Sequence, residues 1–504
     1  MSSDLMTTLV DVTGTIDTMM YTYLLVFMLV FCAIYFTIRT RGVQFRLIKD
    51  MFTQLTEKKH VPGKHSISSF QALMVSTASR VGTGNIAGVA VAIAAGGPGA
   101  VFWMWAMACL GAASAFVEST LAQIWKVRGK EGEFRGGPAY YIEQALGKRG
   151  LGILFACLLI LCYAYGFNGL QAYNMTSALQ YYFSDSDAQM AAMGIGIITA
   201  AFFAFVIFGG SKTISNITSI IVPVMAITYI ALAVYVVATN LSLMGSVFWF
   251  IGTYAFDFQP ILGGFAGSVF VIGIKRGLYS NEAGMGSAPN AAATASVSHP
   301  VKQGLIQSLS VYIDTILICT CSALMIMVFY VKVAGAGIGG ADGMTGMVLV
   351  QAAISNEVGD MGINFISFAI CAFAFSSLLG NYFYAEGNIL FITKSKTALT
   401  IFRVTCLAAV WLGCMSSFDL AWNLADITMG FMAIENLIVI VILGKWAFKA
   451  LADYEEQRNR GENPVFIAER IEGLPATECW HIDRTHLDTV GKQPVVDYVD
   501  EALS

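Results

Sequence analysis

The amino-acid sequence predicts an all-α integral membrane protein that crosses the bilayer about eleven times. Its 504 residues are 56% hydrophobic and only 12% charged, with a mean hydropathy of +0.67. A soluble domain needs about 25% charged residues to cover its surface. Apolar stretches of about 20 residues recur along the chain, which is the length that a helix needs to cross the hydrocarbon core. These observations exclude an ordinary soluble protein.

Eleven apolar segments are long enough to be spanning helices. They lie at residues 20–40, 68–95, 99–124, 151–181, 188–208, 215–239, 259–285, 303–332, 361–392, 398–416 and 420–446. Eleven spans divide naturally into one helix followed by two groups of five, which begin at residues 68 and 259. Because five is odd, the second group enters the membrane from the opposite side. The pattern predicts an inverted repeat, which is common among secondary transporters.

Lysine and arginine residues in the short loops predict the orientation of the chain. They cluster in residues 39–64 and 126–149 and recur in other loops on the same side. The loops expected on the opposite side contain no lysine or arginine. Those loops are residues 1–19, 182–187, 240–258 and 417–419. We therefore expect a multi-pass protein of the cell membrane with its N-terminus outside and its C-terminus in the cytoplasm.

This topology divides the chain into six parts. They are an external N-terminus (1–19), the first spanning helix with a cytoplasmic linker (20–66), the first five-helix repeat (67–239), an external loop (240–258), the second five-helix repeat (259–449) and an acidic cytoplasmic tail (450–504). The tail holds 12 acidic and 5 basic residues, and Trp480 lies among them. We expect an ordinary solvated tail. The alternative is a tail that binds a partner or gates the inner side.

Glycines and polar residues interrupt the first helix of each group of five. Residues 79–88 (SRVGTGNIAG) place two glycines, an arginine and an asparagine deep inside a spanning segment. Glycine weakens a helix there, and polar side chains need partners inside the membrane. Residues 272–289 (IGIKRGLYSNEAGMGSAP) carry a similar set, with Arg, Asn and Ala-Gly at the same offsets. This match favours a common repeat origin.

Two interrupted helices in matching positions indicate a transporter binding site. A broken helix frees backbone N–H groups on one half-helix and C=O groups on the other. The N–H end can hold a carboxylate, and the freed carbonyls can coordinate sodium. The alternative is that the glycines only allow helices to pack closely. Under either interpretation, Arg80 and Arg276 are expected to be structural, bonding exposed carbonyls or pairing with Glu118 or Glu282, and we do not assign them to substrate.

Two further segments carry polar side chains on apolar helices. Ser376 and Ser377 offer adjacent hydroxyl oxygens suited to sodium. Equally, serine in a spanning helix often donates a hydrogen bond to a carbonyl of its own helix. In the fourth segment, Phe167 and Gln171 belong to an aromatic and amide cluster that could close a pocket or simply pack between helices.

Four longer stretches resemble signature sequences of the alanine/glycine:cation symporter family. They are FQALMVSTASRVGTGNIAGVA (70–90), GGPGAVFWMWAMACLG (96–111), GGPAYYIEQALG (136–147) and RGLYSNEAGMGSAP (276–289). The resemblance implies a LeuT-like fold of two inverted five-helix repeats with one extra N-terminal helix. It also implies sodium-coupled import of a small neutral amino acid, alanine or glycine, by alternating access.

The resemblance implies roles for particular residues. Ala78 and Val81 match the positions whose carbonyls hold sodium in LeuT-like carriers, and Ser376 and Ser377 match the paired hydroxyls of that site. The implied substrate contacts lie in the unwound segment of each repeat and in the fourth span. They are Gly82, Thr83, Gly84, Asn85, Phe167, Gln171, Gly273, Ile274 and Gly277.

Asn381 bears on the choice of substrate. It lies one turn after Ser377, at a position where some family members have tryptophan. Because asparagine is smaller and polar, the pocket could admit more than alanine or glycine. A glutamine carrier of the same family is therefore the alternative, and Asn381 is included among the expected substrate contacts.

Other classes of function fit the sequence less well. A channel predicts a continuous polar lining and rings of charge, whereas the polar residues here are confined to local breaks. An enzyme needs a motif such as HExxH or a nucleophile with its base, and no such motif or Walker sequence occurs. The expected partners are the amino acid, sodium as the coupling ion and the lipid bilayer. No nucleic-acid partner and no metal beyond sodium are expected.

Overall fold

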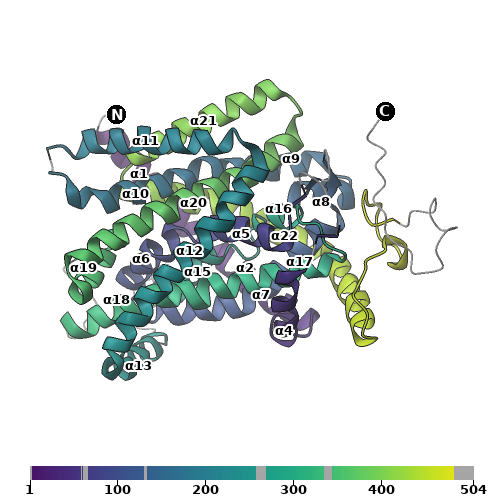
Figure 1. Cartoon of the computed structure of the whole chain (residues 1–504), viewed down its shortest axis with the longest axis horizontal. Coiled ribbons are helices and arrows are strands. Elements are labelled where there is room, and N and C mark those ends of the chain that lie inside the picture. The colour runs from purple at the N-terminus through teal and green to yellow at the C-terminus, as the bar shows by residue number, and fades with distance from the viewer. Residues whose placement is uncertain are drawn as a thin grey trace.

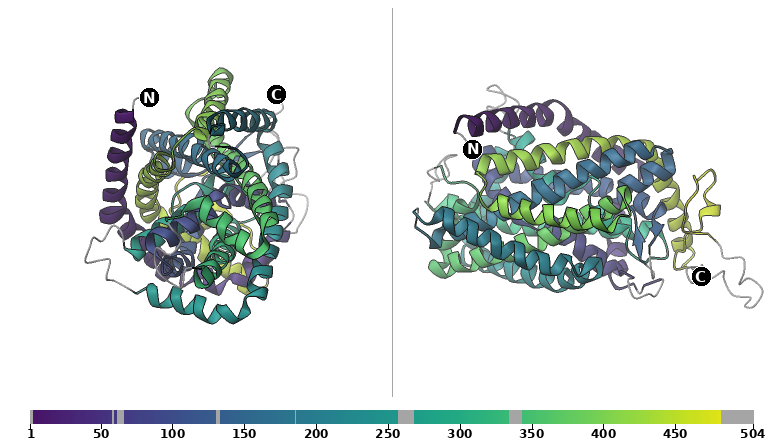
Figure 2. Two further views of the ribbon diagram at one scale, coloured as in Figure 1. Left: turned by 90° about the vertical axis from the view of Figure 1, so that its left-hand side faces the viewer. Right: turned by 90° about the horizontal axis from the view of Figure 1, so that it is seen from above.

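The computed structural model describes residues 3–57, 59–60, 66–129, 133–184, 186–256, 268–333 and 343–481. Long helices lie side by side in one bundle (Figures 1 and 2). The N-terminal helix begins near one end of this bundle, and the described part of the C-terminal tail lies at the other end (Figure 2, right). The arrangement agrees with the odd number of membrane crossings that the sequence predicts.

The first half of the chain ends with the fifth helix of the first repeat. Its elements are α1 (Ser3–Met20), η1 (Tyr21–Leu25), α2 (Val26–Arg39), α3 (Val43–Arg46), α4 (Ile48–Thr53), η2 (Gln54–Thr56), α5 (Ser69–Arg80), η3 (Thr83–Asn85), α6 (Ala87–Gly96), α7 (Ala100–Ile124), β1 (Val127–Arg128), β2 (Phe134–Arg135), α8 (Pro138–Leu146), α9 (Arg149–Leu159), η4 (Ile160–Phe167), α10 (Asn168–Leu179), η5 (Gln180–Tyr182), α11 (Ala188–Ile207) and α12 (Gly210–Thr239). The strands β1 and β2 form a short antiparallel hairpin.

The second half contains the remaining elements. They are η6 (Leu241–Leu243), α13 (Met244–Tyr254), α15 (Val269–Asn281), α16 (Ala288–Ala292), α17 (Pro300–Val311), η8 (Tyr312–Cys319), α18 (Thr320–Val333), α19 (Gly346–Val358), α20 (Asp360–Ile392), α21 (Lys396–Cys414), α22 (Phe418–Asn459) and η9 (Ala468–Arg470).

Nine helices within the described ranges are long and apolar enough to cross a membrane, and the bent pair α5 and η3–α6 makes a tenth. The remaining predicted span, 259–285, begins in residues outside the described ranges and continues as α15. Burial separates central from peripheral helices. In their most apolar windows α7 and α20 are 67% buried, whereas α12 is only 28% buried. The apolar outer surface of such helices requires a lipid environment.

The first predicted break is confirmed. A capping box at Ser68 starts α5, with Gln71 as its partner residue. The helix ends at Arg80, and extended backbone at Gly82 separates it from η3 and α6. The two half-helices are bent by 61°.

The second break lies within the predicted stretch 272–289, but the expectation that it falls between Gly273 and Gly277 is wrong. Helix α15 runs without interruption through Gly273 and Gly277, and the chain leaves the helix only at Glu282. Glu282, Gly284 and Gly286 all have positive φ values, of 54°, 88° and 83°. Glycine adopts this backbone without strain, so the later glycines make the turn that separates α15 from α16.

Gly273 and Gly277 instead allow α15 to pack closely on α7. A Cβ atom on Gly273 would lie 2.6 Å from the Cβ of Trp103 and 2.7 Å from the carbonyl oxygen of Ala100. At Gly277 the nearest atom would be 3.4 Å away, the Cα of Met104. The four-residue spacing is that of a small-xxx-small packing motif, which was the alternative reading of these glycines.

This packing predicts different tolerance at the two glycines. Gly273→Ala is expected to push α15 away from the α7 backbone and to lower the melting temperature of the detergent-solubilised protein by several degrees, since overpacking costs about 1–3 kcal/mol. Gly277→Ala meets only ordinary contacts and serves as the matched control. Fluorescence-detected size-exclusion chromatography after heating measures both; equal stability of the two variants contradicts the packing.

The bundle contains two groups of helices that pack mainly within themselves. Helix α7 packs against α15, α16 and α17, and α20 packs against α10, α12 and α19. Helix α5 contacts α16 and α17 on one side and α12 and α20 on the other. The first broken helix therefore lies where the two groups meet.

Three parts of the predicted division contain helical or packed structure. Within 1–19 the chain is already helical from Ser3, because α1 continues into η1 and α2. The loop 240–258 contains the apolar helix α13. In the tail, α22 continues to Asn459 and Trp480 is only 1% exposed. The expectation of a solvated tail is thus wrong for the segment that ends at Trp480, which packs against the bundle.

Candidate functional site

The expected sodium residues meet where α20 crosses the end of α5. The Ser377 hydroxyl donates to the carbonyl oxygen of Ala78 at 2.8 Å. The two helices are held close at Gly380, where a Cβ atom would lie 2.6 Å from the backbone nitrogen of Ser79. Val81 is buried at the end of α5. Ala78 and Ser377 therefore provide two adjacent hard oxygens from separate helices.

Ser376 differs from its neighbour. Its hydroxyl donates to the carbonyl oxygen of Phe373, one turn earlier in its own helix, at 2.9 Å. This is the local bonding considered as the alternative for both serines. The structure brings Ser377, and not Ser376, into hydrogen-bond contact with the first break.

The unwound segment at Gly82–Asn85 is lined by side chains from α10. The N–H of Thr83 donates to Oε1 of Gln171 at 3.1 Å, and Nδ2 of Asn174 donates to the Thr83 hydroxyl at 2.9 Å. A Cβ atom on Gly82 would lie 2.3 Å from the Ser377 hydroxyl and 3.0 Å from Nε2 of Gln171. A larger residue at this position would displace the Ser377 hydroxyl, because the polar side chains lie directly against the Gly82 backbone.

Aromatic rings cover the other side of this segment. A Cβ atom on Gly84 would lie 2.1 Å from the Tyr279 ring. Phe167 packs on that ring with a centroid separation of 4.9 Å, and Trp422 does so at 5.4 Å. Phe167 was expected in the pocket. Tyr279 and Trp422 were not, although Tyr279 lies inside the motif at 276–289.

The second break is filled by a carboxylate of the protein. Glu118 of α7 accepts hydrogen bonds from the N–H groups of Gly284 at 3.1 Å and Gly286 at 3.0 Å. It also accepts one from Nδ2 of Asn436 at 2.9 Å. The residues expected at this break, Gly273, Ile274 and Gly277, lie within helix α15 instead. The freed amides of the second break therefore already have an anionic partner.

Asn381 belongs to a buried polar network between the two breaks. Its Oδ1 accepts a hydrogen bond from the Ser79 hydroxyl at 2.7 Å, and its Nδ2 donates to Oδ1 of Asn168 at 3.0 Å. Ser79 also donates to Glu282 at 3.0 Å. Nε of Arg80 lies 3.8 Å from Oε2 of Glu282, and the guanidinium group also donates to the carbonyl oxygen of Gln307 at 3.4 Å. The network links the ends of α5 and α15.

Asp314 is an acid that sequence reasoning missed. It lies in η8, is completely buried, and accepts a hydrogen bond from the Ser280 hydroxyl at 2.6 Å and another from Nδ2 of Asn85. Asn85 also accepts a hydrogen bond, from the Ser322 hydroxyl to its carbonyl oxygen, at 2.6 Å. The available signal was one acidic residue inside an otherwise apolar span, which marks a functional position.

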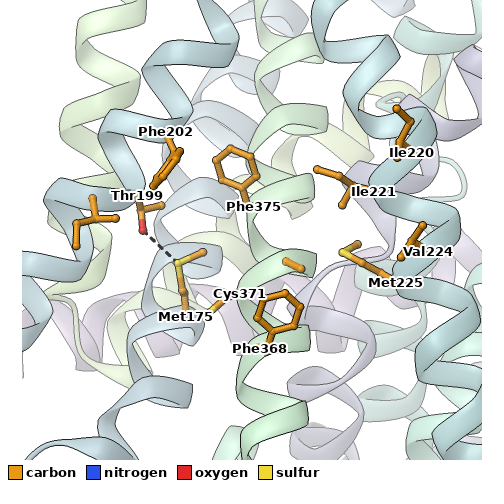
Figure 3. A pocket seen from close by; sticks show the side chains of 12 residues that line it. Met175, Thr199, Phe202, Ile220, Ile221, Val224, Met225, Phe368, Cys371 and Phe375 are labelled. Carbon is orange, nitrogen blue, oxygen red and sulfur yellow. Dashed lines mark hydrogen bonds between the residues drawn. The ribbon is translucent and has the colours of Figure 1, made fainter.

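An apolar cavity of about 510 Å³ lies away from these residues, between α10, α11, α12 and α20 (Figure 3). Its lining contains no charged side chain. The lining residues are Met175, Ile198, Thr199, Phe202, Ile220, Ile221, Val224, Met225, Phe368, Cys371, Ala372 and Phe375. Phe202 and Phe368 are 64% and 75% exposed, so this cavity faces lipid. It offers no partner for the charges of an amino acid.

Comparison with known proteins identifies the family. A profile of the Sodium:alanine symporter family matches residues 6–468. The chain belongs to this family. Amino-acid carrier protein AlsT of Bacillus subtilis is 47% identical over 460 residues, which are 91% of this chain and 95% of AlsT. Probable sodium/glutamine symporter GlnT of the same organism is 44% identical over 482 residues, covering 96% of this chain and 98% of GlnT.

A solved structure shows the fold. The crystal structure of MhsT in complex with L-phenylalanine matches with a TM-score of 0.53 at 13% identity, covering 77% of this chain and 96% of MhsT. The LeuT-like fold expected from the sequence is thereby confirmed. Family membership confirms a multi-pass, sodium-coupled symporter with sodium as its coupling ion.

Proposed function

We propose that the chain imports alanine, or another neutral amino acid of similar size, together with sodium across the cell membrane. The N-terminus is outside and the tail is cytoplasmic in this proposal. The observation that carries it is the break after Arg80. There the Ser377 hydroxyl, bonded to the Ala78 carbonyl, and the amide of Gln171 both lie against the backbone of Gly82 and Thr83. The rings of Phe167 and Tyr279 cover the segment at Gly84.

Sodium is placed between α5 and α20. The Ser377 hydroxyl can turn from the Ala78 carbonyl so that both oxygens face a cation, and the carbonyl of Val81 lies one turn further along α5. Hard oxygen ligands suit sodium, and freed carbonyls at the end of a half-helix carry partial negative charge. Because α5 lies where the two groups of helices meet and α20 belongs to one of them, a bound ion would fix the position of α5 relative to that group.

The substrate is placed at Gly82–Asn85. The amides of the second break are occupied by Glu118, so the first break is the better position for the substrate carboxylate. The N-terminus of α6 attracts negative charge. The ammonium group then faces carbonyls at the end of α5 and the amide oxygen of Gln171, while Phe167 and Tyr279 contact the side chain.

The close covering of this segment favours a small substrate. Ser377, Gln171 and Tyr279 all approach the backbone of Gly82 and Gly84 too closely for a methyl group. Glutamine is the second candidate, because GlnT is 44% identical and Asn381 is polar. Both polar atoms of Asn381, however, bond to Ser79 and Asn168, which favours a positioning role over contact with a larger substrate.

Asp314 supplies a second cation position in this proposal. Its carboxylate, the Ser280 hydroxyl and the Thr315 hydroxyl lie within hydrogen-bond distance of one another beside Asn85. A buried acid grouped with hydroxyls in a membrane can hold a sodium ion or a proton. Its contact with Asn85 would couple that cation to the substrate segment.

Asp314→Asn is expected to reduce alanine uptake by about 10- to 100-fold, because hydrogen bonds to a charged group contribute about 1.5–3 kcal/mol. Asp419→Asn, at the start of α22, is the matched control and should leave uptake unchanged. Uptake by Asp314→Asn at the wild-type rate, with an unchanged sodium dependence, contradicts the second position.

Uptake into proteoliposomes tests the function itself. Labelled alanine should accumulate when sodium is present outside and should not do so when potassium replaces it. Competition by unlabelled alanine enantiomers, glycine and glutamine then ranks the substrates. Alanine uptake that is unchanged in potassium disproves sodium coupling, and stronger competition by glutamine than by alanine replaces the proposed substrate with the second candidate.

A further inference from the structure

The C-terminal segment, residues 463–480, is bound to the end of the bundle where α4, α8 and the start of α17 also lie (Figure 1). This is the cytoplasmic end in the proposed orientation. Trp480 anchors it: the indole is 1% exposed, and its N–H donates to the carbonyl oxygen of Gln123 near the end of α7 at 2.8 Å. A buried tryptophan with a satisfied N–H is an anchor.

The Trp480 ring also contacts the side chain of Lys126, whose pKa burial lowers to about 7. The ammonium group of Lys126 lies 4.3 Å from the Trp480 ring and 4.1 Å from the ring of Phe134 in the β-hairpin. Phe466 packs edge-on against Trp480 with a centroid separation of 5.7 Å. Such cation–π and aromatic contacts contribute in addition to simple burial. They attach the Trp480 end of the segment to the bundle and join it to Phe466 near the other end of the segment.

The first part of the segment binds the chain between α16 and α17. The N–H of Phe466 donates to the carbonyl oxygen of Ser298 at 2.9 Å, and the Ser298 hydroxyl donates to the carbonyl oxygen of Pro464 at 2.8 Å. Nζ of Lys302 donates to Oδ1 of Asn463 at 2.7 Å. The segment therefore binds residues 298–302 through hydrogen bonds of both backbone and side chains.

The chain just before residue 298 in turn contacts the chain that leads into α5, the first broken helix. The N–H of Ser296 donates to the carbonyl oxygen of Ile67 at 3.0 Å, and Ile67 forms a parallel bridge with Ala295. Helix α5 begins at Ser69 and leads directly to Ala78. A continuous path of backbone contacts thus joins the C-terminal segment to the cytoplasmic ends of both interrupted helices.

We propose that residues 463–480 form a cytoplasmic latch, which stabilises the inward-closed state and must loosen before the inner side opens. The inference rests on alternating access as the transport mechanism. Inward opening requires the start of α5 to move relative to α16 and α17. Because residues 295–298 are held by Ile67 on one side and by the latch on the other, this movement strains the latch contacts.

His299 connects the latch to α22. Its ring packs edge-on against Phe466 and Tyr454 at 5.2 Å each, and its Nε2 lies 3.1 Å from Oδ2 of Asp453. Burial lowers the pKa of His299, although Asp453 opposes this shift. Lys302 and Arg470 add positive charge nearby and lower it further. A neutral ring is therefore part of the closed latch.

Cys479 reports directly on the latch because it lies in the segment and is completely buried. Its reaction with a membrane-impermeant maleimide in inside-out vesicles should be slow in saturating sodium and faster without sodium. Sodium bound between α5 and α20 favours the closed inner side. Cys479→Ser gives the background from the other cysteines.

Trp480→Ala should accelerate labelling of Cys479 by about tenfold or more in sodium, since truncating a buried tryptophan costs more than the free energy of a tenfold shift. The apparent KM for external alanine should rise by up to the same factor, because less of the protein remains competent to bind outside. Trp480→Phe keeps an aromatic ring near Lys126 and should be intermediate. Trp249→Ala, on exposed α13, is the matched control.

Two results overturn the latch. One is a wild-type labelling rate that is the same with and without sodium. The other is faster labelling of Trp480→Ala with unchanged KM and turnover, which makes the segment a packing element only. Absence of sodium-dependent uptake by the wild type would instead refute the proposed function, and the labelling of Cys479 would still show whether the segment is bound.

Discussion

Ser377→Ala is expected to raise the sodium concentration for half-maximal alanine uptake by about 10- to 100-fold. The substitution removes the hydroxyl that lies 2.8 Å from the Ala78 carbonyl and leaves that carbonyl without its partner from α20. A hydrogen bond or ligand to a charged group contributes about 1.5–3 kcal/mol, which corresponds to this range. Initial uptake rates in proteoliposomes, measured over a series of external sodium concentrations, provide the test.

Ser376→Ala is the matched control for this experiment. The same atom is removed one residue earlier in α20, but the Ser376 hydroxyl bonds to the Phe373 carbonyl of its own helix. Its sodium dependence should remain within about twofold of the wild type, because exposed or locally satisfied groups contribute little to binding. Equal effects of the two substitutions, or a larger effect of Ser376→Ala, would move the sodium site away from Ser377.

The first break could be predicted from the sequence because its signals are local. Gly82 and Gly84 stand beside Arg80 and Asn85 inside one apolar segment, and the helix ends at Arg80. The sequence alone left open whether Ser376 and Ser377 bind sodium. Only the family resemblance favoured a sodium site at these serines. Which of the two serines faces α5 depends on the rotation of α20, and sequence spacing alone does not determine this.

We expected the second break between Gly273 and Gly277 because charged residues lie there within an apolar segment. Lys275 and Arg276 remain within helix α15 since distant acids neutralise them. Asp426 lies 2.7 Å from Lys275 and 2.6 Å from Arg276, and Asp17 lies 2.5 Å from Lys275. These partners are separated from α15 by well over a hundred residues, so local patterning gives no sign of them.

The packing of the C-terminal tail against the bundle was not predicted, for a related reason. Its composition is acidic, which is typical of a solvated segment. A few apolar residues decide the outcome: Phe466, Cys479 and Trp480 are all buried. Their binding surface is formed by Gln123 and Lys126, at the far end of a different helix. The average charge of the tail therefore indicates the solvent-exposed side of the segment. It does not reveal the apolar side chains that pack against the bundle.

Glu118→Ala should inactivate uptake and reduce the stability of the protein. The carboxylate accepts hydrogen bonds from Gly284, Gly286 and Asn436 in a site without exposure to solvent. Asn436 keeps its hydrogen bond to the Gly284 carbonyl, but the N–H groups of Gly284 and Gly286 lose their partner. Each such buried amide costs about 1–3 kcal/mol, so the loss of this acceptor costs about 2–6 kcal/mol in total. A lower melting temperature in detergent, together with uptake at the background level, is the expected result.

The position of Glu118 explains why the two breaks should respond differently to substitution. At the first break, the Ala78 carbonyl and the Thr83 amide bond to neutral side chains, those of Ser377 and Gln171, which a ligand can displace. Ser377→Ala should therefore change sodium affinity while the protein stays folded. At the second break, a protein carboxylate replaces the anionic ligand, so its removal should destabilise even the substrate-free protein. Glu435→Gln is a suitable control, because in the described part of the chain neither of its carboxyl oxygens has a hydrogen-bond partner. If Glu118→Ala retains the wild-type melting temperature and responds only in substrate affinity, the second break is a ligand site and the division of roles between the breaks is wrong.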